Sequence, residues 1–331
     1  MIDVQHLSKS FTVRRREAGL KNAAAAFFSP HRETVHALND VSFHINSGEM
    51  VGYIGPNGAG KSTTIKIMTG VLTPDSGQCS IDGRTPWKQR KAHVSQIGVV
   101  FGQRSQLWWD LPVGDSFRLI RDIYRVPESE YIKNVRELSE MLSLEEILKT
   151  PARQLSLGQR MRCEIAASLL HSPKVLFLDE PTIGLDAASK LAVREFIRSL
   201  NRSRGTTILL TTHDMQDIEA LTQRIILIGD GRILLDGPLQ QLKDSLSPVR
   251  TVTVLGREKQ SGADIHLPEG VTLRSRQGEG TVRLTLAADT RLAPVPALIE
   301  ALSRQIELFD LSVDQASMDE VVLSLYRRYQ I

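Results

Sequence analysis

A nine-residue segment, Gly55–Thr63 (GPNGAGKST), has the residue types and spacing of a phosphate-binding loop. Its glycines let backbone amides approach an anion closely and adopt positive φ. Lys61 would neutralise the β- and γ-phosphate oxygens, and the Ser62 hydroxyl would bind Mg²⁺. An apolar run precedes the segment and a helical pattern follows it, so we predict a nucleoside triphosphate site. All nine residues are expected to line it: Gly55, Pro56, Asn57, Gly58, Ala59, Gly60, Lys61, Ser62 and Thr63.

In the segment KVLFLDEPT, Lys174–Thr182, two adjacent carboxylates follow an apolar run. Asp179, at the end of the expected strand, would face the Mg²⁺ beside Ser62. Glu180 would point elsewhere and could deprotonate a water for in-line attack on the γ-phosphorus. His213 also ends an apolar run and could hydrogen-bond the γ-phosphate. Each group alone would usually be structural, so the catalytic interpretation depends on the phosphate loop in the same chain.

The segment RQLSLGQRMR, Arg153–Arg162, also has features of an anion site. A serine and a glycine stand where a helix with free amide groups would begin. Further upstream, Gln103 begins a loop that contains the adjacent Trp108 and Trp109. These tryptophans leave two interpretations open: one packs into the core, or the pair forms a surface for a partner.

Strand-like and helix-like segments, which must position these residues, alternate along the chain from Val41 to Asp236. Short β-branched runs without in-and-out alternation are followed by longer helical segments, which predicts a buried, largely parallel sheet in an α/β domain. Residues 112–170 have helical periodicity and no convincing strand. We therefore expect a helical subdomain inserted into the sheet domain.

The pattern changes after residue 238. Residues 239–248 predict a helical linker, and residues 249–331 predict a small α+β domain from two alternating runs and two helix-like stretches. Residues 14–34 interrupt the first strand region and carry a local excess of positive charge. This interruption is interpreted either as a solvated loop with an alanine-rich helical turn or as a contact for a membrane partner or lipid headgroups.

The overall composition excludes several classes of protein. With 41 Lys and Arg against 38 Asp and Glu, the net charge of +3 gives no argument for nucleic acid or acidic lipid. The two cysteines, Cys79 and Cys163, form no CxxC or Cys/His pattern, which argues against a disulfide framework or a zinc site. No apolar run approaches the roughly 18 to 20 residues that span a bilayer.

Six motifs, in order, resemble those of the nucleotide-binding subunit of an ABC transporter. They are GPNGAGKST (Walker A), FGQRSQ (Q-loop), LSLGQRMR (signature), VLFLDEPT (Walker B), IGLDA (D-loop) and TTHD (switch histidine). The resemblance covers residues 1–238. It implies a P-loop NTPase cassette with a mostly parallel sheet, an antiparallel β subdomain and the inserted helical subdomain, ahead of the small α+β domain. ATP and Mg²⁺ are the implied cofactors, and ATP hydrolysis is the implied activity.

The resemblance also implies roles for individual residues within one chain. Phe11 stands where the family stacks an aromatic ring on adenine. Gln103 joins Ser62 and Asp179 as a ligand of Mg²⁺. The implied catalytic residues are Glu180, His213 and Gln103.

Further residues would act across a homodimer, because the family holds each ATP between the Walker motifs of one copy and the signature of the other. Ser156, Gly158 and Gln159 would meet the γ-phosphate in trans, and Asp186 would communicate across the interface. Leu157 departs from the family's common glycine. If it points away from the phosphates the site works, and if the position needs positive φ a leucine is strained there. We favour the first of these because the serine, the second glycine and the glutamine are all present.

The details of the motifs most resemble ATPases of drug, lipid and polysaccharide exporters whose membrane subunits are separate proteins. The resemblance implies integral-membrane permease partners, no nucleic-acid partner, and a peripheral location on the cytoplasmic face of the plasma membrane. Export is favoured over import. Two further classes within the same family stay open: a soluble ABC ATPase acting on DNA or ribosomes, and a regulatory ATPase whose C-terminal domain senses a ligand.

Overall fold

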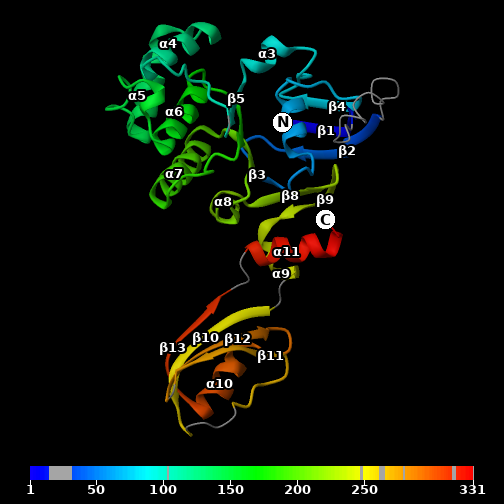
Figure 1. Cartoon of the computed structure of the whole chain (residues 1–331), viewed down its shortest axis with the longest axis vertical. Helices are drawn as coiled ribbons and strands as arrows, with labels where there is room; N and C mark the ends of the chain where they lie inside the picture. Colours follow the sequence, from blue (N-terminus) through cyan, green and yellow to red (C-terminus); the bar gives the residue numbers. More distant parts are fainter. Residues whose placement is uncertain are drawn as a thin grey trace, which may run out of the picture. The chain divides into compact units, whose positions relative to one another are not determined.

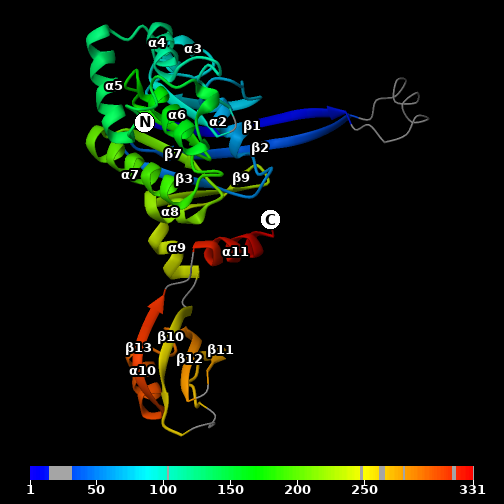
Figure 2. The ribbon, with the colours of Figure 1, turned by 60° about the vertical axis from the view of Figure 1, so that its left-hand side comes forward.

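The computed structural model describes residues 1–14, 32–102, 104–246, 249–260, 265–278, 280–314 and 318–330. Figures 1 and 2 show the chain in two orientations. It divides into two compact units, Met1–Gly237 and Pro238–Gln330. Each unit is described by itself below.

A six-stranded sheet forms the centre of the first unit, with strand order β5-β6-β7-β3-β8-β9. Neighbours from β5 to β8 are parallel. Nearly every residue of the inner strands is buried, which explains their unbroken apolar sequences. The strands are β3 (Met50–Ile54), β5 (Ile97–Phe101), β6 (Val175–Asp179), β7 (Thr207–Thr211), β8 (Arg224–Gly229) and β9 (Arg232–Pro238).

Helices follow these strands, as the alternating sequence pattern predicts. Helix α2 (Lys61–Met68) follows β3, α7 (Ala187–Arg204) follows β6, and α8 (Met215–Leu221) follows β7. The short α3 (Arg90–Val94) precedes β5. These connections confirm the predicted α/β architecture.

A second, antiparallel sheet has the order β2-β1-β4. Its strands are β1 (Ile2–Arg14), β2 (Arg32–Ile45) and β4 (Ser76–Ile81). Strands β1 and β2 form a long antiparallel pair that projects beyond the rest of this unit in Figure 2, and Arg14 lies opposite Arg32 at its end. Residues 15–31 lie outside the described residues, so both interpretations of the sequence between these strands stay open.

The inserted helices are α4 (Val113–Tyr124), α5 (Glu128–Leu142) and α6 (Leu157–Leu169), with a 3₁₀ turn at Ala152–Gln154. Prolines precede α4 and α5, where the missing N–H costs no helical hydrogen bond. Helix α6 packs against both α5 and β5. The three helices lie together at the upper left in Figure 1. The predicted helical subdomain is thus confirmed.

The second unit contains an antiparallel sheet of order β11-β12-β10-β13. Apolar side chains of β10 and β12 form its core with Leu298 and Leu302 of α10. The sheet and α10 give the α+β fold expected from the sequence. The elements are α9 (Leu239–Leu246), β10 (Val249–Glu258), β11 (Val271–Gln277), β12 (Thr281–Asp289), α10 (Val295–Gln305), β13 (Ile306–Asp314) and α11 (Met318–Tyr329).

Among the described residues of the whole chain, no helix is long and apolar enough to cross a bilayer.

Candidate functional site

The predicted chemical groups follow three neighbouring strands. Strand β7 lies between β3 and β6, and all three run in the same direction. Their carboxyl ends therefore meet at one edge of the sheet. The phosphate loop follows β3, the Asp179–Glu180 pair ends β6, and His213 follows β7. This is the edge where open parallel sheets bind ligands.

The backbone of the phosphate loop requires its glycines. Gly58 has φ 84° and Gly60 has φ 110°. A Cβ on Gly60 would lie 2.6 Å from the carbonyl oxygen of Ala37, and one on Gly55 would lie 2.1 Å from that of Ile228. Larger residues at either position would displace the loop from the strands behind it. Gly58 and Gly60 therefore have the predicted positive φ, whereas Gly55 does not and is required for the close approach to β8.

Lys61 is the buried charge of this loop, with 7% of its surface exposed. Its Nζ donates to the carbonyl oxygens of Gly55 at 2.6 Å and Pro56 at 2.9 Å. Burial lowers the pKa of Lys61, and the nearby carboxylates of Glu180 and Asp179 oppose that shift. The ammonium group is thus held between the loop and the two acids, where it could pair with a phosphate.

The two carboxylates after β6 differ in their surroundings. Asp179 Oδ1 accepts a hydrogen bond from Thr211 Oγ1 of β7 at 2.5 Å. Glu180 has a left-handed backbone, with φ 56°, and its Oε1 lies 2.8 Å from Nε2 of His213. The two carboxylates thus contact different partners, Thr211 for Asp179 and His213 for Glu180. Glu180 and His213 are thereby placed as a pair that could orient and deprotonate a water.

The oxygen donors near this edge fit a magnesium ion bound largely by phosphates and water. Ser62 is an exposed hydroxyl at the start of α2, and Asp179 supplies a carboxylate. Within the described part of the chain there is no group of three His, Cys, Asp or Glu side chains that could hold a metal by itself. Mg²⁺ commonly takes one or two protein oxygens and completes its shell with phosphate and water. Gln103, the third predicted ligand, lies outside the described residues.

The second predicted anion segment begins a helix, as expected. Ser156 caps α6: its Oγ accepts from the Gln159 amide at 3.2 Å, and Gln159 Oε1 accepts from the Ser156 amide at 2.9 Å. Ser156 is exposed at this helix N-terminus. Exposed hydroxyl and amide groups at a helix start can bind a phosphate.

Leu157 occupies the first turn of α6 and does not have positive φ. The position therefore does not require glycine, and a leucine is not strained there. Its Cδ2 lies 2.8 Å from where a Cβ on Gly184 would stand, and 41% of Leu157 is exposed. The side chain thus leans toward the segment that precedes α7, beside an equally exposed Ile183.

Asp186 is brought close to the same helix start. It caps α7, and its Oδ1 accepts from the Ser189 amide at 2.7 Å. This backbone hydrogen bond from Ser189 holds the pKa of Asp186 below its usual value. A Cβ on Gly158 would lie 2.6 Å from Ser189 Oγ, so a larger residue there would press on Ser189 where α6 approaches α7. The predicted trans-acting residues therefore cluster at two neighbouring helix starts.

Phe11 lies on β1 opposite Val35 of β2, and its ring is half-buried. Lys9 Nζ stands 5.7 Å from the ring centroid. Two residues beyond Val35, the carbonyl of Ala37 backs Gly60 of the phosphate loop. Strand β2 therefore connects Phe11 to the phosphate loop.

The two tryptophans are both exposed, Trp108 by 40% and Trp109 by 52%. The interpretation that one of them packs into the core is therefore wrong. The guanidinium of Arg160, from α6, lies 5.3 Å from the Trp109 ring centroid. Leu111 is exposed beside them, which makes this loop an apolar surface next to the helical subdomain.

Sequence reasoning missed Glu164, a buried carboxylate on α6 with 4% exposure. It accepts hydrogen bonds from Ser105 Oγ and, at 2.9 Å, from the Gln106 amide. Burial raises the pKa of Glu164, and these hydrogen bonds oppose the rise. The sequence signal that could have indicated a buried carboxylate was the single charged residue in the largely apolar run CEIAASLL. Glu164 ties α6 to the loop that leads to the tryptophans.

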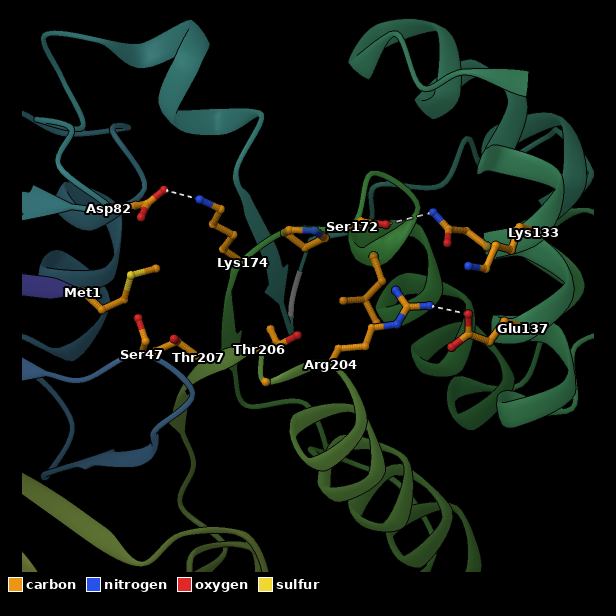
Figure 3. A pocket seen from close by; sticks show the side chains of 14 residues that line it. Met1, Ser47, Asp82, Lys133, Glu137, Ser172, Lys174, Arg204, Thr206 and Thr207 are labelled. Carbon is orange, nitrogen blue, oxygen red and sulfur yellow. Dashed lines mark hydrogen bonds and ion pairs between the residues drawn. The ribbon is translucent and has the colours of Figure 1, made fainter. Parts of the chain in front are cut away.

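A separate cavity of about 590 Å³ lies at the opposite edge of the sheet, where β6 and β7 begin (Figure 3). Two ion pairs line it: Lys174 with Asp82 at 2.9 Å, and Arg204 with Glu137 at 2.9 Å. Lys133 also points toward it. The second pair joins α7 to α5 and so ties the helical subdomain to a helix of the sheet domain. The cavity contains none of the predicted nucleotide-binding residues.

Comparisons with known proteins agree with this geometry. The sequence model of the ABC transporter family matches residues 38–183. The daunorubicin resistance ATP-binding protein DrrA3 of Streptomyces coeruleorubidus is 32% identical over 293 residues, which are 87% of this chain and 90% of that protein. The probable sulfate/thiosulfate import ATP-binding protein CysA of Chlorella vulgaris is 34% identical over 220 residues, 66% of this chain and 92% of that protein.

Among solved structures, a dimeric post-hydrolysis state of the ATP-binding cassette MJ0796, bound to ADP and Pi, matches with a TM-score of 0.60 and 28% identity. The match covers 72% of this chain and 99% of that cassette. These likenesses agree with the cassette fold described above, and they support ATP binding and hydrolysis by this chain. The chain belongs to the ATP-binding proteins of the ABC transporter family.

Proposed function

We propose that the chain works as a homodimer in which two ATP molecules are each held between the phosphate loop of one copy and the start of α6 in the other. The observation that carries this proposal is the exposed, capped helix start at Ser156, whose hydroxyl and amide groups offer a second phosphate-binding surface. The dimeric state of the similar cassette MJ0796, bound to ADP and Pi, supports a dimer for this chain. ATP would close the dimer, and hydrolysis would reopen it.

Within each site, Lys61 would bind the β- and γ-phosphates, and Phe11 would stack on adenine. Ser62 and Asp179, with Gln103, would hold Mg²⁺, which supplies charge neutralisation at the phosphate oxygens. Glu180 would take a proton from the attacking water. His213, 2.8 Å from Glu180, would hold that carboxylate in place and reach the γ-phosphate.

We further propose that the dimer powers export through separate permease subunits, at the cytoplasmic face of the membrane. The likeness to the resistance protein DrrA3 spans 293 residues, more than the 237 of the first unit, so it extends into the second. The likeness to the import protein CysA spans 220 residues, which the first unit alone could supply. Resistance to a toxic compound is a task that an exporter serves.

The permease contact is placed on the loop of Trp108 and Trp109, since exposed aromatic side chains concentrate binding energy at interfaces. The full chain expressed with its neighbouring genes should co-purify with a multispanning membrane protein. Replacing Trp108 and Trp109 with alanine should weaken that complex by about tenfold or more. ATP hydrolysis by the isolated chain should stay unchanged.

The paired control for that experiment is Leu273→Ala, an exposed leucine on the second unit. It should leave both the complex and the hydrolysis intact. Hydrolysis stimulated by DNA or ribosomes, with no membrane partner, would instead favour a soluble ATPase. A requirement for a secreted binding protein would favour import.

Leu157 should affect how readily the dimer closes. Its exposed surface would be covered by the second copy, and burying this part of a leucine contributes about 1 kcal/mol per copy. With two copies in the dimer, Leu157→Ala and Leu157→Gly should therefore weaken the ATP-bound dimer about 30-fold. The measurement is ATP-dependent dimerisation by analytical ultracentrifugation, in a Glu180→Gln background.

Leu119→Ala is the matched control, because Leu119 is 38% exposed on another helix of the same subdomain. It should leave dimerisation unchanged. If both Leu157 variants dimerise as tightly as their parent, Leu157 has no part in closure. If only Leu157→Gly is weaker, the effect comes from the flexibility of glycine in the first turn of α6.

A further inference from the structure

Asp217 is a completely buried carboxylate beside the site, and the proposed chemistry does not use it directly. It lies in α8 with no solvent exposure. Arg194 Nε, from α7, donates to its Oδ1 at 2.5 Å. The hydroxyls of Thr182 and Thr212 both donate to its Oδ2, the latter at 3.1 Å. Side chains from three different segments therefore converge on one carboxylate.

The two threonines lie next to the proposed catalytic pair in sequence. Thr182 is two residues after Glu180, and Thr212 directly precedes His213. Both threonines are buried, with 2% and 3% exposure. Oδ2 of Asp217 thereby connects the turn after β6 to the loop after β7. These are the two segments that place Glu180 and His213 2.8 Å apart.

Such a connection meets a physical need at this position. Glu180 has a left-handed backbone, which costs energy for a residue other than glycine and persists only when its surroundings fix it. The Glu180 amide donates to the carbonyl of Thr211 at 2.9 Å, which fixes the residue on one side. The hydroxyl of Thr182 fixes the turn on the other side. His213 itself is half-exposed and directly follows the buried Thr212.

The network also reaches α7, the helix that Asp186 caps. Lys190 of α7 donates to Asp214 Oδ2 at 2.6 Å, and Asp214 directly follows His213. Arg194, one turn further along α7, holds Asp217. The segment that follows His213 is thus bound to α7 by two ion pairs. A shift of α7 at the proposed dimer interface would reach Glu180 and His213 through these ion pairs.

We propose that Asp217 is a positioning residue for ATP hydrolysis, which sets the geometry of Glu180 and His213 through Thr182 and Thr212. This inference rests on the proposed role of Glu180 as the base. It differs from a purely structural role, in which the network stabilises the fold and any loss of activity follows loss of folded protein.

The test uses Thr182→Val and Thr212→Val, which remove the hydroxyl donors but keep the shape and the Asp217–Arg194 pair. Each should lower kcat by about 10- to 100-fold, the range expected when a reacting group is misplaced. KM for ATP should change by less than about twofold, because the phosphate loop is untouched. Asp217→Asn, which puts an amide against Arg194, should have at least as large an effect.

Glu49→Gln is the matched control. Glu49 forms a 2.9 Å ion pair with Arg224 near the start of β3, at the opposite edge of the sheet from Glu180. This variant loses a partly buried carboxylate of the same unit and should keep the parental kcat. Thermal unfolding of each variant shows whether the protein is folded at the assay temperature.

The decisive measurement repeats the threonine substitutions in a Glu180→Gln background, by single-turnover hydrolysis. There they should have a clearly smaller effect, because Glu180, the base that they position, is gone and only the placement of His213 is left to change. An equal fall in both backgrounds, or a normal kcat in the double valine variant, overturns the proposal. A normal rate in Glu180→Gln alone overturns the assignment of the base instead, so the two failures are distinguishable.

Discussion

Glu180→Gln should reduce the rate of ATP hydrolysis by about 10²- to 10⁴-fold, the usual contribution of a general base. Glutamine has nearly the same shape and can still hydrogen-bond His213, but it cannot take a proton from water. ATP binding should remain, because Lys61 and the loop amides are unchanged. The ATP-bound dimer should then accumulate, and size-exclusion chromatography with ATP and Mg²⁺ would detect it.

Glu195→Gln, an exposed position on α7, is the control for that change of charge. It should hydrolyse ATP at the parental rate and form no trapped dimer. Normal turnover by Glu180→Gln would remove Glu180 from the role of base. An inactive variant that stays monomeric with ATP would contradict the shared site instead.

Lys61→Ala should weaken ATP binding itself, by about 10- to 100-fold, as expected when a hydrogen bond to a charged group is lost. The alanine also leaves the carbonyls of Gly55 and Pro56 without their donor, so the loop should lose its shape as well. The affinity can be measured by titration with a fluorescent ATP analogue. This separates Lys61, which acts in binding, from Glu180, which acts in turnover.

Lys66→Ala tests whether the effect is specific, because Lys66 lies on the same helix in its last turn. That variant should bind ATP with the parental affinity. Equal losses in the two variants would mean that only the overall positive charge of α2 matters. Unchanged affinity in Lys61→Ala would contradict the assignment of the phosphate loop.

The arrangement of the phosphate loop, the paired acids and His213 could be predicted from the sequence for a simple reason. Each follows an apolar run of a parallel strand, and the carboxyl ends of parallel strands lie at one edge of a sheet. Ser156 at a helix start was equally readable, because serine followed three residues later by glutamine is a capping pattern.

Other features depend on contacts between distant residues and could not be read locally. Asp217 bonds Thr182 across 35 positions, and Glu164 bonds Gln106 across 58, so neither carboxylate shows its partners in the sequence. The exposure of both tryptophans depends on how the loop packs against α6. The backbone angle of Leu157 could be inferred only indirectly, from the family residues present around it, because it is set by where α6 begins.

The left-handed backbone of Glu180 has a consequence for the thermal stability of the protein. A glutamate with φ 56° costs the folded state about 1 kcal/mol that glycine would not, so the first unit folds against a small penalty at this turn. Screening for heat resistance alone would tend to select glycine or asparagine at position 180 and would remove the proposed base. A more heat-stable form of this ATPase should therefore be sought in positions away from the end of β6.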